Sequence, residues 1–214
     1  MGGSVKRMHR LIMLSDAYRM SGDATDSQLE KDPDNRLLTR FAMRRKTVEE
    51  IRDSLLQLDG SLDLTIGGAL TSGTGTDNEF SDARKSMHPD NTKRRTLYLQ
   101  LRRSNLATLL SLFDFGDATT SGENREQTNV APQALYMMNS KFVAEQARAL
   151  DERIRKEAGT DARAKIDRAY RLLFARSPDP EEVKIGLEYV ASGTKAWPRY
   201  LQALLGSGEF SSVN

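Results

Sequence analysis

The sequence predicts a mainly α-helical protein, an irregular helical bundle with one short β-strand or hairpin and two long polar loops. Apolar residues recur at the helical spacing of three and four positions along most of the chain, and helix-capping signatures precede several of these segments. Gly, Ser, Thr and Asn concentrate in two stretches between them. With 214 residues, of which 38% are hydrophobic, the chain can form one sizeable core, so we expect a single helical domain over residues 1–214.

The N-terminal region predicts two helices before residue 45. Ser4 can cap a first helix, whose apolar residues follow the helical period from Val5 to Ile12. Asp32 and Pro33 resemble an N-cap followed by proline at the first helical position. They predict a second, short helix with three buried side chains, Leu37, Leu38 and Phe41.

A third helix follows a capping box formed by Thr47 and Glu50, in which each side chain accepts a hydrogen bond from the other residue's backbone amide. The helix is expected to end at Gly60 and to bury four apolar residues, Val48, Ile51, Leu55 and Leu58. Residues 61–93 then become rich in Gly, Ser, Thr, Asn and Asp, which predicts a long flexible loop.

Residues 94–104 predict the strand. Three leucines, Leu97, Leu99 and Leu101, alternate with Thr96, Tyr98 and Gln100, as in a half-buried strand. An arginine pair stands at each end. The next helix is expected from about Ser104 to Gly116, and a second polar loop runs to Val130.

The C-terminal residues 132–214 predict an antiparallel helical subregion. Pro132 starts its first helix, with Leu135 and Met138 facing inward, and Asn139–Ser140 breaks that helix. Two further helices begin after the capping residues Asp161 and Asp179. A last short helix buries Trp197, Leu201, Leu204 and Leu205.

Composition excludes several kinds of site. The net charge of +2 gives no overall field toward nucleic acid or an anionic surface. The chain has no cysteine and two histidines, which excludes disulfides, thiolate metal sites and a three-histidine site, so we expect neither metal nor cofactor. No apolar run is long enough to span a bilayer, and the start of the chain shows no signal-peptide core.

Three arginine pairs are the candidate binding residues: Arg44–Arg45, Arg94–Arg95 and Arg102–Arg103, together with Tyr98. The planar guanidinium suits phosphate, sulfate or carboxylate, so the pairs can form an anion pocket. The other interpretation is that they bind carboxylates of this chain such as Glu50, Asp53, Asp114 or Asp117 and hold the loops in place. Basic clusters with so little aromatic interleaving do not favour nucleic-acid binding.

No complete catalytic motif is present. Asp114-Phe115-Gly116 matches the magnesium-binding triplet of protein kinases, but the other kinase motifs are missing. Asp114 and Asp117 remain as acid/base candidates, and His9 is a candidate general base that is more typical of a histidine at the edge of a core.

Blocks of residues along nearly the whole chain resemble a planctomycete-type domain of unknown function. They are Ser4 to Lys6, His9 to Ser15 with Tyr18, Asp32 to Leu38, Glu50 to Asp53, Arg94 to Tyr98, Phe113 to Phe115, Pro132 to Leu135 with Asn139–Ser140, Ala169 to Leu173 before Arg176, Leu204–Leu205 and Glu209–Phe210. The resemblance implies a C-terminal module of large exported proteins that often carry a cytochrome c-type domain. It also implies a further segment before Ser4, and it brings no catalytic residues.

The sequence and this resemblance together predict a non-catalytic interaction module of an exported multidomain protein, at the periplasm or cell surface. Its partners are expected to be neighbouring domains or an envelope polymer, without membrane insertion. The alternative is an enzyme acting on an anionic carbohydrate-type substrate, bound by Arg94, Arg95, Arg102 and Arg103 with Asp114 or Asp117 as acid/base.

Overall fold

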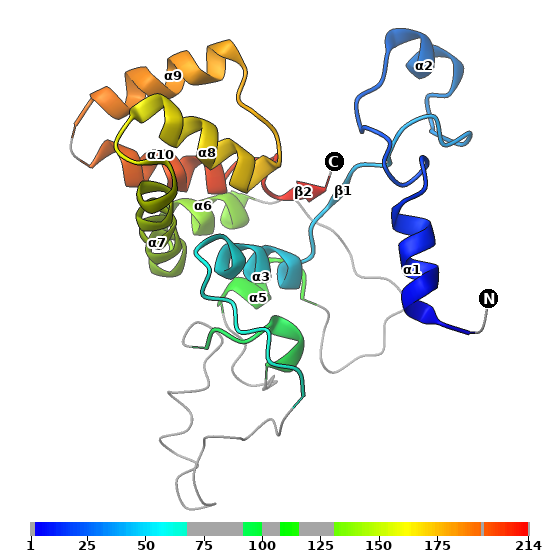
Figure 1. The fold of residues 1–214 in the computed structure, drawn as a ribbon, viewed down its shortest axis with the longest axis horizontal. Helices are drawn as coiled ribbons and strands as arrows, with labels where there is room; N and C mark the ends of the chain where they lie inside the picture. Colours follow the sequence, from blue (N-terminus) through cyan, green and yellow to red (C-terminus); the bar gives the residue numbers. More distant parts are fainter. Residues whose placement is uncertain (1–2, 68–91, 100–107, 116–130, 194, 214) are drawn as a thin grey trace, which may run out of the picture. The chain divides into compact units, whose positions relative to one another are not determined.

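We describe the protein from a computed structural model, over residues 3–67, 92–99, 108–115, 131–193 and 195–213. These ranges contain nine α-helices and one two-stranded antiparallel sheet, which confirms the mainly helical fold class (Figure 1). By their contacts they divide into two compact units. Unit 1 comprises residues 1–45 and 212–214, and unit 2 comprises residues 46–211. No feature of the sequence predicts a boundary near Arg45.

Unit 1 holds two helices and the sheet. Helix α1 spans Val5–Met13 and begins as predicted, with the Ser4 hydroxyl accepting the Arg7 amide at 3.4 Å. Helix α2 spans Asp26–Lys31. Strand β1, Arg44–Arg45, pairs antiparallel with β2, Ser212–Val213, at the other end of the chain.

The short helix predicted after Asp32 is wrong. Thr25 and Gln28 form a capping box that starts α2 upstream, and Asp32 is the C-cap of that helix. The buried Asp32 carboxylate instead accepts the amides of Arg36 at 2.7 Å and Leu37 at 2.9 Å. These hydrogen bonds shape a turn, which leaves Leu37 and Leu38 exposed.

Polar contacts therefore organise unit 1. The Arg40 guanidinium donates to the carbonyl oxygens of Asp32 at 2.9 Å and Pro33 at 2.6 Å. Asn35 exchanges hydrogen bonds with the Arg40 backbone. Among the described residues of this unit only Asp32 is fully buried, so unit 1 has no apolar core of its own.

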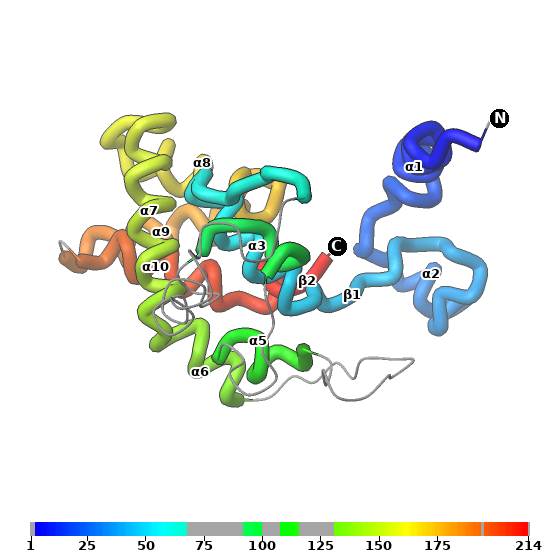
Figure 2. Tube along the Cα trace, turned by 90° about the horizontal axis from the view of Figure 1, so that it is seen from below, coloured from blue at the N-terminus to red at the C-terminus, as the bar shows by residue number. Residues whose placement is uncertain are grey.

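Among its described residues, unit 2 contains α3 (Val48–Leu58), the 3-10 turn η2 (Thr96–Tyr98), α5 (Thr108–Leu112), α6 (Ala131–Asn139), α7 (Lys141–Ala158), α8 (Ala162–Phe174), α9 (Pro180–Ala191) and α10 (Ala196–Leu205). Helices α7, α8, α9 and α10 gather at one side of the unit in both views (Figures 1 and 2). Helix α10 packs against α6, α7, α8 and α9, while α3 packs against α5 and α7.

The core of unit 2 joins these helices. Its largest fully buried apolar side chains are Ile51, Leu55, Leu56, Leu109, Leu110, Leu150, Ile154, Ile166, Leu201, Leu205 and Phe210. The caps at Thr47, Asp161 and Asp179 are confirmed, and so is the break before α7 at Ser140. Gly186 permits a close approach of α9 to α10, because a Cβ there would lie 2.7 Å from the Tyr200 hydroxyl.

Two predictions within unit 2 are wrong. Leu135 and Met138 are exposed, whereas Gln133 and Met137 are buried, because α6 turns a different stripe inward. The buried Gln133 amide donates to the Leu112 carbonyl oxygen at 2.8 Å. In place of the strand predicted from residue 94, the described residues up to Leu99 form an isolated β-bridge at Arg94 and a 3-10 turn at Thr96–Tyr98.

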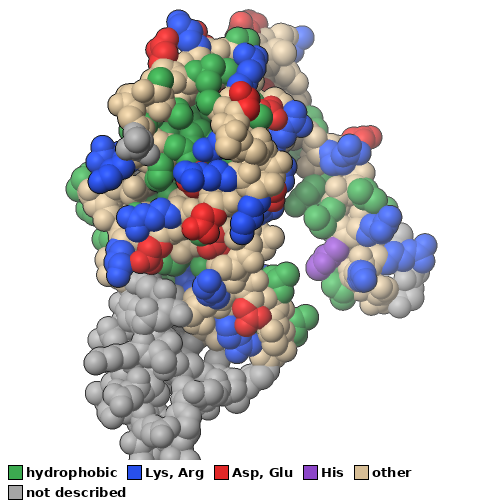
Figure 3. Space-filling view, turned by 60° about the vertical axis from the view of Figure 1, so that its left-hand side comes forward, with side chains coloured by type: hydrophobic (Ala, Val, Ile, Leu, Met, Phe, Trp, Pro, Cys, Tyr) green, Lys and Arg blue, Asp and Glu red, His purple; other side chains and the backbone are tan. Residues whose placement is uncertain are grey.

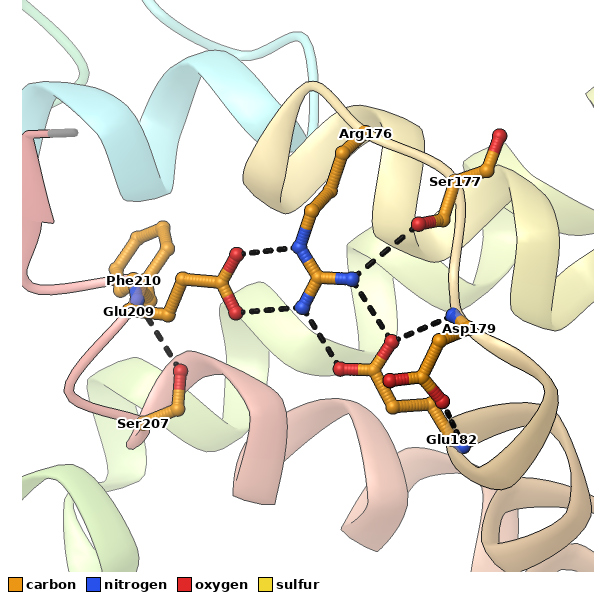
Figure 4. A network of polar contacts seen from close by, with 7 residues as sticks. All are labelled: Arg176, Ser177, Asp179, Glu182, Ser207, Glu209 and Phe210. Carbon is orange, nitrogen blue, oxygen red and sulfur yellow. Dashed lines mark hydrogen bonds and ion pairs between the residues drawn. The ribbon is translucent and has the colours of Figure 1, made fainter. Parts of the chain in front are cut away.

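The connection between α8 and α9 is fixed by Arg176 (Figure 4). Its guanidinium donates to both carboxylate oxygens of Glu182, at 2.7 and 2.8 Å, and to both of Glu209, at 2.7 and 2.8 Å. The same guanidinium lies over the ring of Tyr170, 5.3 Å from its centroid. One side chain thus ties the start of α9 to the segment after α10.

Candidate functional site

The side chains of Arg52 and Asp53, on α3, position residues 92–97. Arg52 is fully buried, and its guanidinium donates to the carbonyl oxygens of Thr92 at 2.5 Å and Arg94 at 2.9 Å. The Asp53 carboxylate accepts the Thr96 amide at 2.8 Å and the Thr96 hydroxyl at 2.6 Å. Apart from a β-bridge between Asp63 and Arg94, these bonds take the place of strand pairing, since they satisfy backbone groups of the segment.

Arg94 and Arg95 have different surroundings. The Arg94 guanidinium donates to the Gly67 carbonyl oxygen at 2.5 Å and lies 5.1 Å from the centroid of the Tyr98 ring. Arg95 is exposed, and its Nε lies 3.7 Å from a carboxylate oxygen of Asp53. Arg95 therefore pairs with a carboxylate of this chain, as the second interpretation of the arginine pairs expects.

A cleft of about 720 Å³ opens beside α3 and this segment. Its described lining residues are Glu49, Glu50, Asp53, Ser54, Gln57, Leu62, Leu64, Arg95, Thr96, Leu97, Leu99 and Phe115. The lining combines a polar side, formed by α3 and residues 95–96, with an apolar side that includes Leu62, Leu64, Leu97 and Leu99. All of these residues belong to unit 2.

The polar side of the cleft carries three carboxylates and one guanidinium. Glu50 accepts the Thr47 amide at 2.8 Å within the capping box, and Asp53 holds Thr96. On the apolar side, Leu64 is 61% exposed and Leu97 is 72% exposed. Two leucines held this far out of the core are suited to contact another apolar surface.

The structure separates the other residues predicted for the site. Arg44 and Arg45 form β1 in unit 1, and His9 is exposed on α1 in the same unit. Asp114 is half-buried after α5, 3.5 Å from the Gln133 amide. Arg102, Arg103 and Asp117 lie outside the described residues. Tyr98 is half-buried and contacts Arg94.

The sequence reasoning missed Arg52, which organises the site without lining the cleft. Only one signal pointed to it: an arginine stands on α3 one position after the buried Ile51, and its neighbours in the helical stripe are apolar. An arginine at such a position must find acceptors inside the protein, because burying an unpaired guanidinium is very costly.

Across the described part of the chain, His, Asp and Glu side chains do not form a group of three that could hold a metal ion. No helix of this part is both long and apolar enough to cross a bilayer.

Comparison with known proteins identifies a family. The family model PSD1, described as a protein of unknown function (DUF1553), matches residues 1–190. No curated protein and no solved structure matches the chain.

Proposed function

The chain belongs to the PSD1 family of proteins of unknown function (DUF1553), and from the cleft we propose that it is a non-catalytic interaction module of a larger exported multidomain protein. Its proposed partner is a neighbouring domain of that protein. The proposal of an exported protein rests on the resemblance to the planctomycete-type domain described above.

The single observation that carries this proposal is the pair of exposed leucines on the cleft. Leu64 and Leu97 belong to separate segments, which Asp63 and Arg94 join by a β-bridge. Hydrogen bonds of the Arg52 and Asp53 side chains hold the second segment against α3, and Leu97 is exposed on that segment. Apolar side chains that the fold positions on a surface are typical of protein interfaces.

The lining indicates the chemistry of the partner. A segment with apolar side chains fits the side formed by Leu62, Leu64 and Leu97. On the polar side, Asp53 lies 3.7 Å from both Arg52 and Arg95, so its charge is already met by guanidinium groups of this chain. We therefore propose a docked segment of the neighbouring domain that presents apolar residues to these leucines.

The alternative enzyme would need arginines that converge on an anion. Of the described arginines only Arg95 lines the cleft, and it already lies beside Asp53. Arg94 donates to backbone oxygens of residues 65 and 67. The geometry therefore favours the interaction module, and binding of an anionic carbohydrate stays a prediction.

The test is association with the remaining part of the parent protein, produced separately and measured by pull-down and calorimetry. Leu97→Asp should weaken the association at least tenfold, since it places a charge within an apolar contact. The matched control is Ile185→Asp on α9, where Ile185 is 55% exposed and far from the cleft lining in sequence.

The control should bind as the unchanged chain does, and both variants should keep the helical circular dichroism of the parent. No association at all, or equal weakening by both variants, would overturn the proposal.

A further inference from the structure

Helix α1 presents an apolar face that the other described residues of unit 1 leave exposed. Four side chains form this face: Val5 is 60% exposed, Met8 50%, Leu11 60% and Ile12 48%. They stand at positions three, four and seven apart, so they share one side of the helix. The Ser4 cap starts the helix at Val5, which fixes this register.

The remaining side of α1 is basic. Lys6 and Arg10 lie on the side opposite the apolar face, together with Met13 at the end of the helix, and Arg7 and His9 stand at the two edges of the apolar face. Between Val5 and Met13 the helix contains no acidic residue. Every charge that flanks the apolar face therefore has the same sign.

Unit 1 gives this face no core to join. Besides Asp32, no described residue of the unit is fully buried, and the next residues, Met13 and Leu14, are also more than half exposed. Figure 3 shows hydrophobic and basic side chains side by side on the surface of this unit.

We propose that α1 binds the surface of an anionic lipid bilayer. In this arrangement the helix lies in the plane of the membrane, with Met8 and Ile12 below the headgroups and the basic side chains at the lipid phosphates. An apolar face, a basic opposite side and low average hydrophobicity are the features of interfacial helices. The uniform positive charge favours an anionic surface over a zwitterionic one.

A bilayer suits this helix better than a protein groove does. The four apolar side chains are three aliphatic groups and one thioether, whose sulfur is only a weak acceptor, so they impose little hydrogen-bonding geometry on a partner. Basic residues on the opposite side would remain in solvent in a groove, but they reach the headgroup phosphates at a membrane. The proposal concerns unit 1 and is independent of the cleft in unit 2.

The experiment is co-sedimentation of the full chain with vesicles of phosphatidylglycerol and phosphatidylcholine, compared with vesicles of phosphatidylcholine alone. Binding is expected on the anionic vesicles and should fall as salt is raised. Met8→Gln combined with Ile12→Gln should reduce binding at least tenfold, since both apolar anchors are lost while the helix is kept.

Arg7→Gln combined with Arg10→Gln should reduce binding about tenfold and remove much of the salt dependence. The matched control is Arg148→Gln combined with Arg163→Gln, which removes the same charge from exposed positions on α7 and α8. It should leave binding unchanged within about twofold.

Three results would overturn the proposal: no vesicle binding, equal binding to both kinds of vesicle, or equal loss in the control. If vesicles are not bound but the Met8 and Ile12 variant loses association with the rest of the parent protein, α1 binds a protein instead. Loss of the cleft interaction in Leu97→Asp would not alter vesicle binding, so the two proposals fail separately.

Discussion

Unit 1 and unit 2 use the same amphipathic helical pattern with opposite results. In α7 of unit 2 the stripe that includes Val143, Leu150 and Ile154 is fully buried. In α1 of unit 1 the stripe from Val5 to Ile12 is exposed. The comparison shows that the period of apolar residues predicts a helix and which of its faces is apolar. It does not predict whether other residues of this chain bury that face.

The two units also differ in what holds them together. Unit 2 is joined by apolar packing and by buried polar contacts such as those of Arg52. On the face of unit 2 that Figure 3 draws, basic and acidic side chains are interleaved. Unit 1 is joined by hydrogen bonds around Asp32 and Arg40, and the charges of α1 are all positive.

The largest expected effect contrasts one substitution in the two units. Leu150→Ala should lower the free energy of unfolding of unit 2 by about 3 kcal/mol, because it leaves a cavity in a packed core. Leu11→Ala removes the same atoms from a side chain that is 60% exposed. It should change the free energy of unfolding by less than about 0.5 kcal/mol. Urea unfolding followed by circular dichroism measures both. Equal losses would contradict the contrast.

A second expected effect concerns the polar support of the cleft. Arg52→Met should destabilise unit 2 by about 3 kcal/mol, because it leaves the carbonyl oxygens of Thr92 and Arg94 without this buried donor. Arg95→Met is the matched control. Its side chain is 46% exposed and lies 3.7 Å from Asp53, so its loss should cost less than about 1 kcal/mol.

Denaturant unfolding distinguishes these two arginines. Arg52→Met should also abolish docking at the cleft, since Thr96 and Leu97 lose their fixed position. A variant that keeps both full stability and docking would show that Arg52 does not organise the segment.

The smallest expected effect is pH-dependent and lies in the Arg176 contacts. Hydrogen bonds from the Arg176 guanidinium hold the pKa of Glu182 below its usual value. The Glu182 carboxylate therefore binds a proton more readily in the unfolded chain than in the folded one. The stabilisation that its contact with Arg176 provides is present above about pH 4.3 and is lost as the pH falls through the folded pKa. Glu182→Gln should cost about 1 kcal/mol at pH 7, and the difference should shrink below about pH 4.

Glu181→Gln on the same helix provides the control for that titration. Glu181 is 67% exposed in its side chain and lies 3.5 Å from Lys184, so its removal should change stability little at any pH. A Glu182→Gln loss that stays constant from pH 7 to pH 3 would contradict the assigned role of the carboxylate.

Local signals account for what could be predicted from the sequence. Thr47, Asp161 and Asp179 each cap a helix by accepting a hydrogen bond from the amide three residues ahead. Such a cap depends only on residues within one helical turn, so the sequence alone can predict it. The same rule applied to Thr25 and Gln28 would have found α2, but Asp32–Pro33 was the more conspicuous signal.

The cleft could not be predicted because contacts between distant residues form it. Alternation in residues 96–101 is typical of a strand, yet Asp53 accepts the Thr96 amide across 43 positions and favours a turn. That turn puts Leu99 in the core and leaves Leu97 exposed, although strand alternation places them on one face. The buried stripe of α6, Gln133 and Met137, shows a similar limit, since it is set by packing against α5, α7 and α10 and by the hydrogen bond from Gln133 to the Leu112 carbonyl oxygen.

Hydrogen exchange of the full chain in solution tests most directly the claim that only unit 2 has its own core. We expect amides of α1 to exchange with little protection, while those of α7, α8 and α10 exchange only through global unfolding of unit 2. Anionic vesicles should then raise the protection of α1 alone. Protection of α1 equal to that of α7 in the absence of vesicles would contradict the account.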